Sequence, residues 1–331
     1  MERRNRFLII GVALASLLAA PANAGADGLP LPVSVSADGV TAPSGTDRYV
    51  TLRAERGTVI ARIDQDGGEV LRARSIDDAL TVPAVGYNGS PSGLSADGET
   101  LVLIRPRGSF PQARTQFAVV AAERLKVRDR ITLRGDFSFD AISPDGSRLY
   151  FIEYLSRTDP TRYEVRAYDL RSRRLLPEPI VDPDEPPGEM RGYPMTRAVS
   201  ADGRWAYTLY DGGGNHPFVH ALDTVAGKAV CIDIHALTEI PAFRGALAGN
   251  SSRFGLGVSS DGSELSVLDR KQERPLALVD TASFEVSTPS EADDGGGFPW
   301  LELILVPLGA AAGWVLIRGL RRRRLATGGA G

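Results

Sequence analysis

The side chains that most often bind metal ions are scarce in this sequence. Three histidines occur, His216, His220 and His235, and the first two are four residues apart in NHPFVH. This segment has the composition of a strand, where residues four apart share a face but lie about 13 Å apart at roughly 3.3 Å per residue. Two ligands so far apart cannot hold one metal ion directly. We therefore interpret these histidines as turn or strand residues, and no H-E-x-x-H motif is present.

Two short acidic segments bring several carboxylates together, and clustered oxygen ligands are what calcium prefers. The segments are DQDGGE at 64 to 69 and DPDEPPGE at 182 to 189. Neither has the full ligand spacing of a calcium loop, so we interpret both as solvated turns. The sequence predicts no metal site and no cofactor.

Motifs for nucleophilic catalysis and for nucleotide binding are also missing from the sequence. It contains no G-x-S-x-G, no G-x-x-x-x-G-K and no C-x-x-C. Its one cysteine, Cys231, lies in the strand-like run KAVCIDI and is predicted to be a buried apolar residue. The sequence therefore predicts no catalytic residues.

The most regular carboxylates belong to an internal repeat. ISPDG at 142 to 146 recurs as VSADG at 35 to 39, LSADG at 94 to 98, VSADG at 199 to 203 and VSSDG at 258 to 262. Asp can bond its own backbone two residues on, and Gly accepts a positive φ, so the motif suits a tight turn. A residue that recurs once per repeat serves the turn rather than catalysis. The structural aspartates are Asp38, Asp97, Asp145, Asp202 and Asp261.

The elements around these turns are predicted to be strands. Each turn except the first leads into an alternating or apolar segment, such as SRLYFIEYL or RWAYTLYD. A second series of strand, turn, strand units lies in phase with the first, 19 to 26 residues further on. Two hairpins per period of roughly 50 residues predict a four-stranded unit repeated about five times. The corresponding positions of the second turns are Asp64, Ala121, Asp169, Asp223 and Asp280.

These repeats carry a resemblance to a known family. VHALDTVAGKAV and LALVDTASFEV, each preceded by an S-x-D-G strand, resemble the YVTN-type and WD-repeat-like β-propellers. The whole exported part resembles uncharacterised actinobacterial membrane-anchored propeller proteins. The resemblance covers about residues 30 to 290 and implies an all-β fold, a β-propeller of five four-stranded blades, or six if the inserts hide short strands. In the first repeat two readings remain open, because APSGTDRYVTLRA at 42 to 54 could replace VSADG as the first turn and strand.

The two ends of the chain predict its location. Basic residues, an apolar run and Ala22-Asn23-Ala24 indicate a signal peptide over residues 1–24. Residues 299–320 have the length and apolar character of one transmembrane helix, and the arginines after it indicate a cytoplasmic tail at 321–331. Between them we expect an extracytoplasmic propeller over 25–290 and a flexible linker over 291–298. Gly309 and Gly313 form a G-x-x-x-G pattern that would permit weak helix pairing.

The exported part is acidic. Without the predicted signal peptide and the tail from Phe298, 39 acidic and 30 basic side chains remain. This charge excludes nucleic acid and docking on anionic lipid as expected partners, and it leaves envelope proteins, small ligands and cations open. The membrane is expected to be contacted through the C-terminal helix alone.

The loops that enter the first strand of each repeat are expected to form the mouth of a propeller channel, where such folds bind. They offer aromatic and arginine side chains of the kind enriched at binding sites. We predict a binding or scaffolding module of the cell envelope. The alternatives are an enzyme like the propeller lactonases or lyases, and a sensor of an external signal. The candidate binding residues are Tyr87, Asn88, Phe139, Asp140, Arg191, Tyr193, Arg197 and Arg253.

Overall fold

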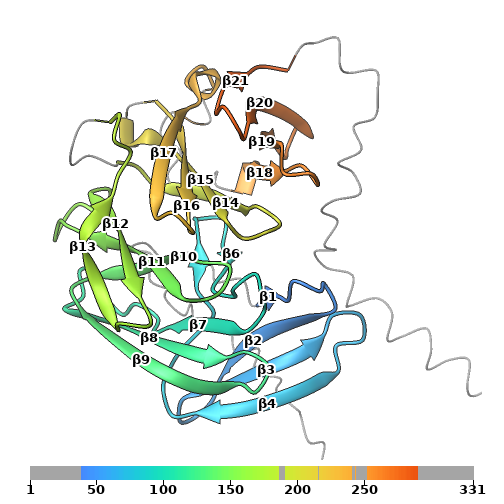
Figure 1. Ribbon diagram of the computed structural model, residues 1–331, viewed down its shortest axis with the longest axis vertical. Coiled ribbons are helices and arrows are strands. Elements are labelled where there is room, and N and C mark those ends of the chain that lie inside the picture. Colours follow the sequence, from blue (N-terminus) through green and yellow to red (C-terminus); the bar gives the residue numbers. More distant parts are fainter. Residues whose placement is uncertain (1–38, 186–190, 215, 241–242, 244–251, 290–331) are drawn as a thin grey trace, which may run out of the picture. The chain divides into compact units, whose positions relative to one another are not determined.

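Figure 1 shows the computed structural model of the chain. The structure describes residues 39–185, 191–214, 216–240, 243 and 252–289. The chain divides into two units, residues 1–288 and 289–331, and everything below concerns the first. The predicted signal peptide, linker, transmembrane helix and tail lie outside the described residues, as does Asp38. Within the described residues no helix is both long and apolar enough to cross a membrane.

The described residues form short antiparallel strands and two 3-10 helices, which confirms the predicted all-β class. The first nine strands are β1 (Val40–Thr41), β2 (Asp47–Arg53), β3 (Thr58–Asp64), β4 (Val70–Ile76), β5 (Ala84–Val85), β6 (Ser90–Pro91), β7 (Thr100–Ile104), β8 (Arg114–Ala121) and β9 (Lys126–Arg134). The next eight are β10 (Phe137–Ile142), β11 (Arg148–Tyr154), β12 (Tyr163–Asp169), β13 (Arg174–Ile180), β14 (Pro194–Val199), β15 (Trp205–Tyr210), β16 (Phe218–Asp223) and β17 (Lys228–Asp233). The remaining elements are β18 (Phe254–Val258), β19 (Glu264–Asp269), β20 (Arg274–Asp280), β21 (Val286–Ser287), η1 (Gly212–Gly214) and η2 (His235–Leu237).

Strand order confirms the predicted four-stranded unit. Four sheets have four strands each in chain order, namely β1–β4, β10–β13, β14–β17 and β18–β21 (Figure 1). The second repeat is split into the three-stranded sheet β7–β9 and the two-stranded sheet β5–β6. A single bridge between Leu94 and Leu101 sets the start of LSADG against β7, where the other repeats have a full first strand. The described residues thus form five repeats when counted by sequence and six sheets when counted by hydrogen bonding.

The first repeat follows the second of the two readings left open by the sequence. The turn that joins β1 to β2 is Ala42–Thr46, and Ala42 and Asp47 close it with a backbone hydrogen bond of 2.7 Å. VSADG at 35 to 39 precedes β1 in the sequence, and its residues 35–38 lie outside the described residues. Asp64, at the end of β3, occupies the predicted second turn of this sheet.

The S-x-D-G turns share one hydrogen-bond pattern. In the turn before β11, the Asp145 carboxylate accepts bonds from Ser143 Oγ at 2.6 Å and from the Ser147 amide at 3.0 Å. Ser143 Oγ in turn accepts the Arg148 amide at 2.9 Å, and Gly146 has a φ of 67° that favours glycine. These bonds lower the pKa of Asp145, and at Asp261 the same environment lowers it to about 2. The equivalent serine bonds occur at Ser95, Ser200 and Ser259.

Apolar clusters lie between successive sheets and form the core. Phe117 of β8 stacks on Phe151 of β11 with ring centroids 4.4 Å apart, which joins the second repeat to the third. Similar clusters join β2–β4 to β7 and β8, β10–β13 to β15–β17, and β14–β17 to β18–β20. The Tyr150 hydroxyl adds a hydrogen bond of 2.6 Å to the Thr224 carbonyl in the next sheet. Neighbouring sheets therefore bury the faces that they turn toward each other.

Candidate functional site: a tyrosine-lined cavity

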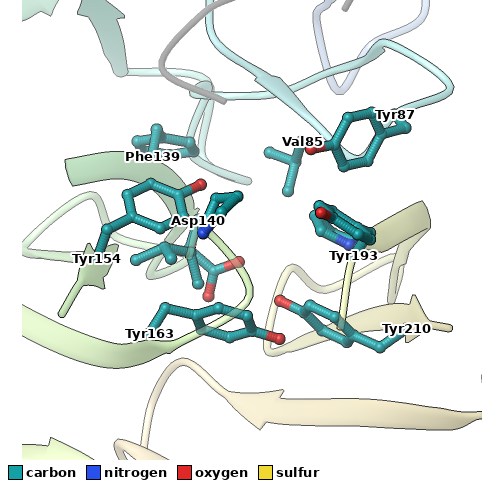
Figure 2. Close-up of a pocket in the computed structure, with 11 residues that line it drawn as sticks. Val85, Tyr87, Phe139, Asp140, Tyr154, Tyr163, Tyr193 and Tyr210 are labelled. Carbon is teal, nitrogen blue, oxygen red and sulfur yellow. The ribbon is translucent and has the colours of Figure 1, made fainter. Parts of the chain in front are cut away.

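A small cavity lies where the third and fourth repeats meet the β5–β6 hairpin. Its volume is about 10 Å³, which is room for roughly one water molecule. Figure 2 shows its walls, which are mainly aromatic, with the Asp140 carboxylate among them. The aromatic side chains in the wall are Tyr87, Phe139, Tyr154, Tyr163, Tyr193 and Tyr210.

Backbone hydrogen bonds bring the sequence-distant β5–β6 hairpin to the fourth repeat. The amide of Tyr87, in the turn between β5 and β6, donates to the Pro194 carbonyl at 2.8 Å. The next amide, of Asn88, donates to the Met195 carbonyl at 3.2 Å, and Asn88 Nδ2 donates to Thr196 Oγ1 at 2.9 Å. The second repeat therefore supplies one wall of a cavity whose other walls come from later repeats.

The other tyrosines are placed by antiparallel pairing. Tyr154 at the end of β11 is the register partner of Tyr163 at the start of β12. Tyr210 at the end of β15 is the partner of Pro194 at the start of β14. Because the end of a second strand lies beside the start of the first and third strands, these tyrosines gather at one edge of their sheets.

The rings contact one another around the cavity. Tyr87 and Tyr193 meet edge to face with centroids 5.5 Å apart, and Tyr163 stacks on Tyr210 at 5.6 Å. Figure 2 shows the hydroxyl groups of Tyr163 and Tyr210 pointing toward each other. Such pairs add about 0.5–1.5 kcal/mol each beyond the area they bury, so the wall is a packed structure in its own right.

The tyrosine hydroxyls of this wall stay protonated at physiological pH. Burial raises the pKa of Tyr154 to about 12, and it also raises the pKa values of Tyr87, Tyr163 and Tyr210. A neutral phenol both donates and accepts a hydrogen bond. The wall therefore offers polar groups without offering phenolate charge.

Asp140 and Arg197 form a buried ion pair beside the cavity. Arg197 Nη2 contacts Asp140 Oδ1, and Nη1 donates to the Asp140 carbonyl at 2.8 Å. The two side chains are only 1% and 4% exposed, for Asp140 and Arg197 respectively. Among the described residues, Asp140 Oδ2 has no hydrogen-bond partner. One oxygen of the carboxylate is thus committed to Arg197, and the other is an unused acceptor.

A second buried ion pair supports the wall at Tyr154. Arg107 Nη1 contacts Asp136 Oδ1, and both side chains are under 5% exposed. The Arg107 guanidinium lies 5.2 Å from the ring centroid of Tyr154, whose hydroxyl is 3.0 Å from Ser138 Oγ. Burial raises the pKa of Asp136 even though Arg107 acts to lower it.

His216 and His220 lie in a loop and in a strand, and neither shares a metal-binding arrangement with the other in the described residues. His216 precedes β16 instead of lying in it, and its Nε2 is 2.7 Å from Asp233 Oδ1. His220 is buried in β16, where its Nδ1 is 3.9 Å from the sulfur of Cys231. Burial lowers the pKa of His220 to about 4 and raises that of Cys231 to about 12, so both are neutral at physiological pH. Cys231, predicted to be a buried apolar residue, is partly buried.

The structure brings together some of the predicted binding residues and separates others. Tyr87, Phe139, Asp140 and Tyr193 line the cavity. Asn88 and Arg197 contact residues beside it, through Thr196 and Asp140 respectively. Arg191 and Arg253 do not line it, and Arg253 instead pairs with Asp269 Oδ2 at 2.6 Å.

The predicted local structure of three site residues is wrong. Phe139 and Asp140 lie in β10 and Arg197 lies in β14, whereas all three were expected in loops. Sequence reasoning also missed Tyr154, Tyr163 and Tyr210, since it considered only the segments that enter a first strand. The tyrosines that end SRLYFIEY and RWAYTLY were the available signal, because an antiparallel hairpin returns that end to the same edge.

Comparisons with known proteins add distant similarities only. No family model and no curated protein matches the chain. Hydrazine synthase from Kuenenia stuttgartiensis is similar at a TM-score of 0.45 and 17% identity, over 73% of this chain and 70% of that chain. TolB from Acinetobacter baumannii is similar at a TM-score of 0.40 and 14% identity, over 74% of this chain and 53% of that chain. The β-propeller domain of Cps50 (Swd1) from Myceliophteria thermophila is similar at a TM-score of 0.44 and 11% identity, over 76% of this chain and 70% of that chain.

Proposed function

We propose that the chain is a membrane-tethered, extracytoplasmic β-propeller that binds a protein or a small ligand of the cell envelope. The observation that carries this proposal is the convergence of five tyrosines, from three repeats, on one cavity beside a buried ion pair. Tyrosine supplies a large contact area at a low entropic cost and keeps a polar tip. A binding role accounts for this concentration of tyrosine better than core packing does, because core packing has no need of hydroxyl groups.

The propeller part of the proposal is supported by strand order. Successive antiparallel sheets, each in chain order, with an apolar cluster between neighbours, are the elements from which a propeller ring is built. We propose five blades by repeat count, or six by sheet count. The location is supported by the sequence alone, through the signal pattern of residues 1–24, the apolar residues 299–320 and the arginines after them.

A second candidate function rests on Asp140. A buried carboxylate with one unused oxygen beside a cavity could act as a general base, which is the feature that an enzyme of the lactonase or lyase type would need. This candidate predicts turnover of a simple aryl lactone by the purified chain and its loss on Asp140→Asn. Absence of turnover by the wild-type chain with that lactone would contradict the lactonase form of it.

Site-specific photo-cross-linking tests the binding function. A photoreactive phenylalanine derivative is placed at Tyr193, which is half-buried at the cavity, and separately at Leu71, which is 48% exposed on β4. In cells that naturally produce the chain, we expect a discrete adduct from position 193 and none from position 71. The Tyr87→Ala variant should weaken the adduct at 193, because Tyr87 supports the ring of Tyr193. Equal adducts from both positions, or none from either, would contradict binding of a protein at the cavity.

The proposed location needs its own test. Reporter fusions that are active only outside the cytoplasm, joined after residue 289 and after residue 331, should be active at the first junction and inactive at the second. Activity at both junctions would contradict the cytoplasmic tail, and inactivity at both would contradict export.

A further inference from the structure

We propose that the tyrosine-lined cavity binds a primary ammonium group, such as the head of a lysine side chain or of an alkylamine. This proposal rests on the proposed function, since it names the chemical group that the same site recognises. Four features of the cavity support it: its size, its unused acceptor, its aromatic walls and the charges around it.

The size of the cavity selects a very small head group. A volume of about 10 Å³ admits a single group of water size, and an –NH₃⁺ head is of that size. A planar guanidinium, a carboxylate or a sugar ring would need the tyrosine walls to move apart. A linear alkyl chain behind the ammonium could leave through the open side of the cavity.

The unused polar atoms select a hydrogen-bond donor. Asp140 is 1% exposed, and its Oδ2 accepts no bond from any residue that the structure describes. The hydroxyl of Tyr87 is likewise buried without a partner among those residues. A buried acceptor without a donor is costly, so a ligand that brings donors is favoured over one that brings acceptors. An ammonium group brings three donors and no acceptor.

The aromatic walls favour a positive charge. Cations are attracted to the faces of aromatic rings within about 6 Å of the centroid. The pKa values of the tyrosines are raised, so their rings stay neutral phenols with intact hydroxyl donors and acceptors. Pairs such as Tyr87 with Tyr193 and Tyr163 with Tyr210 are spaced at 5.5 and 5.6 Å, which holds the walls close to a small guest.

The charged side chains near the cavity do not oppose the binding of an ammonium group. The two guanidinium groups next to the cavity, of Arg107 and Arg197, are each paired with a buried aspartate. Asp211 adds a further carboxylate, which accepts the Tyr193 amide at 2.7 Å and acts electrostatically on Tyr87. The two positive charges are therefore neutralised locally, and Asp211 adds a third acidic group beside the cavity residues Tyr193 and Tyr87.

Titration of the full-length chain in nanodiscs tests the proposal. The probe is n-butylammonium chloride, the neutral control is 1-butanol, and sodium chloride keeps the ionic strength constant. Ligand-observed NMR should show saturable binding of butylammonium, at least about tenfold tighter than that of 1-butanol. Binding of the two probes with equal affinity, or no saturable binding of butylammonium, would overturn the proposal.

Two variants locate the binding. Asp140→Asn removes the charged acceptor and should weaken butylammonium binding at least about tenfold. Because this change can also unfold the chain, Tyr193→Leu serves as a second variant that removes one aromatic wall, and it should weaken binding severalfold. Asp97→Asn, in an S-x-D-G turn that does not line the cavity, is the matched control and should bind like the wild type. Wild-type binding by a folded Asp140→Asn or Tyr193→Leu chain would place the ammonium elsewhere and overturn the proposal.

The outcome can be separated from that of the proposed function. A specific cross-link at Tyr193 without butylammonium binding would retain the binding module and reject the ammonium. Butylammonium binding without any cross-linked protein would support the ammonium site and point to a small amine as the ligand.

Discussion

Asp140 of β10 and Arg197 of β14 are 57 residues apart in the chain and form an ion pair that is almost wholly shielded from water. The pair lies where two successive sheets meet, and its Asp140 also lines the tyrosine-lined cavity. Structure and candidate function thus depend on the same two side chains.

Removal of one partner of this pair should be strongly destabilising. Arg197→Met leaves the Asp140 carboxylate buried and unpaired, and we expect the free energy of unfolding to fall by about 3–5 kcal/mol. Replacing both residues, Asp140→Leu with Arg197→Met, should recover most of that loss. Urea unfolding monitored by circular dichroism measures both effects. Arg204→Met, which breaks the more exposed pair with Asp223, is the control and should change stability little.

Stability should fall with acidity through His220. Its pKa is about 4 in the folded chain and 6.5 in the reference state, so the unfolded chain takes up the proton first as the pH falls. This stabilisation is complete above about pH 6.5. It is lost progressively toward pH 4, where the free energy of unfolding is lower by about 3 kcal/mol. Thermal unfolding at several pH values should show this slope, and His220→Gln should flatten it. His235→Gln, at an exposed position, should leave the slope unchanged.

The S-x-D-G turns should produce a second, more acidic transition. The turn hydrogen bonds lower the pKa values of Asp145, Asp202 and Asp261. The carboxylates therefore add to the free energy of unfolding above about pH 4, and this stabilisation is lost as the pH falls toward 2. At neutral pH, Asp145→Ala removes bonds to Ser143 and Ser147 and should cost about 1 kcal/mol in urea unfolding. Asp66→Ala, at an exposed position in the β3–β4 turn, should cost nothing measurable. An equal loss in both variants would contradict the structural role of the motif.

The single cysteine should react slowly in the folded chain. Burial raises the pKa of Cys231 to about 12, so the thiolate fraction at pH 8 is roughly a hundredfold or more below that of a free cysteine. Alkylation by iodoacetamide, followed by mass spectrometry, should therefore be at least about a hundredfold slower in buffer than in urea. Similar rates in the two conditions would show that the thiol is exposed or activated.

The repeats were predictable because they are local. A turn that needs Ser, Asp and Gly at set positions leaves a recognisable sequence, and the strands beside it show apolar alternation. Asp145 and Asp261 make the same bonds in turns far apart in the chain. The all-β class and the four-stranded unit follow from such local signals, without knowledge of how the sheets meet.

The site was only partly predictable because it depends on contacts between repeats. Tyr87 and Tyr193 could be proposed from their loops, but Tyr210 reaches the cavity only because its strand runs antiparallel to the one that begins at Pro194. Asp140 was expected in an exposed loop, and the packing of β10 against the next sheet makes it a buried partner of Arg197. Sequence alone determined the turns and the strands, and it supplies the whole basis for the proposed location. Tertiary structure decided which polar side chains lose contact with water, since burial depends on neighbours that the local sequence does not specify.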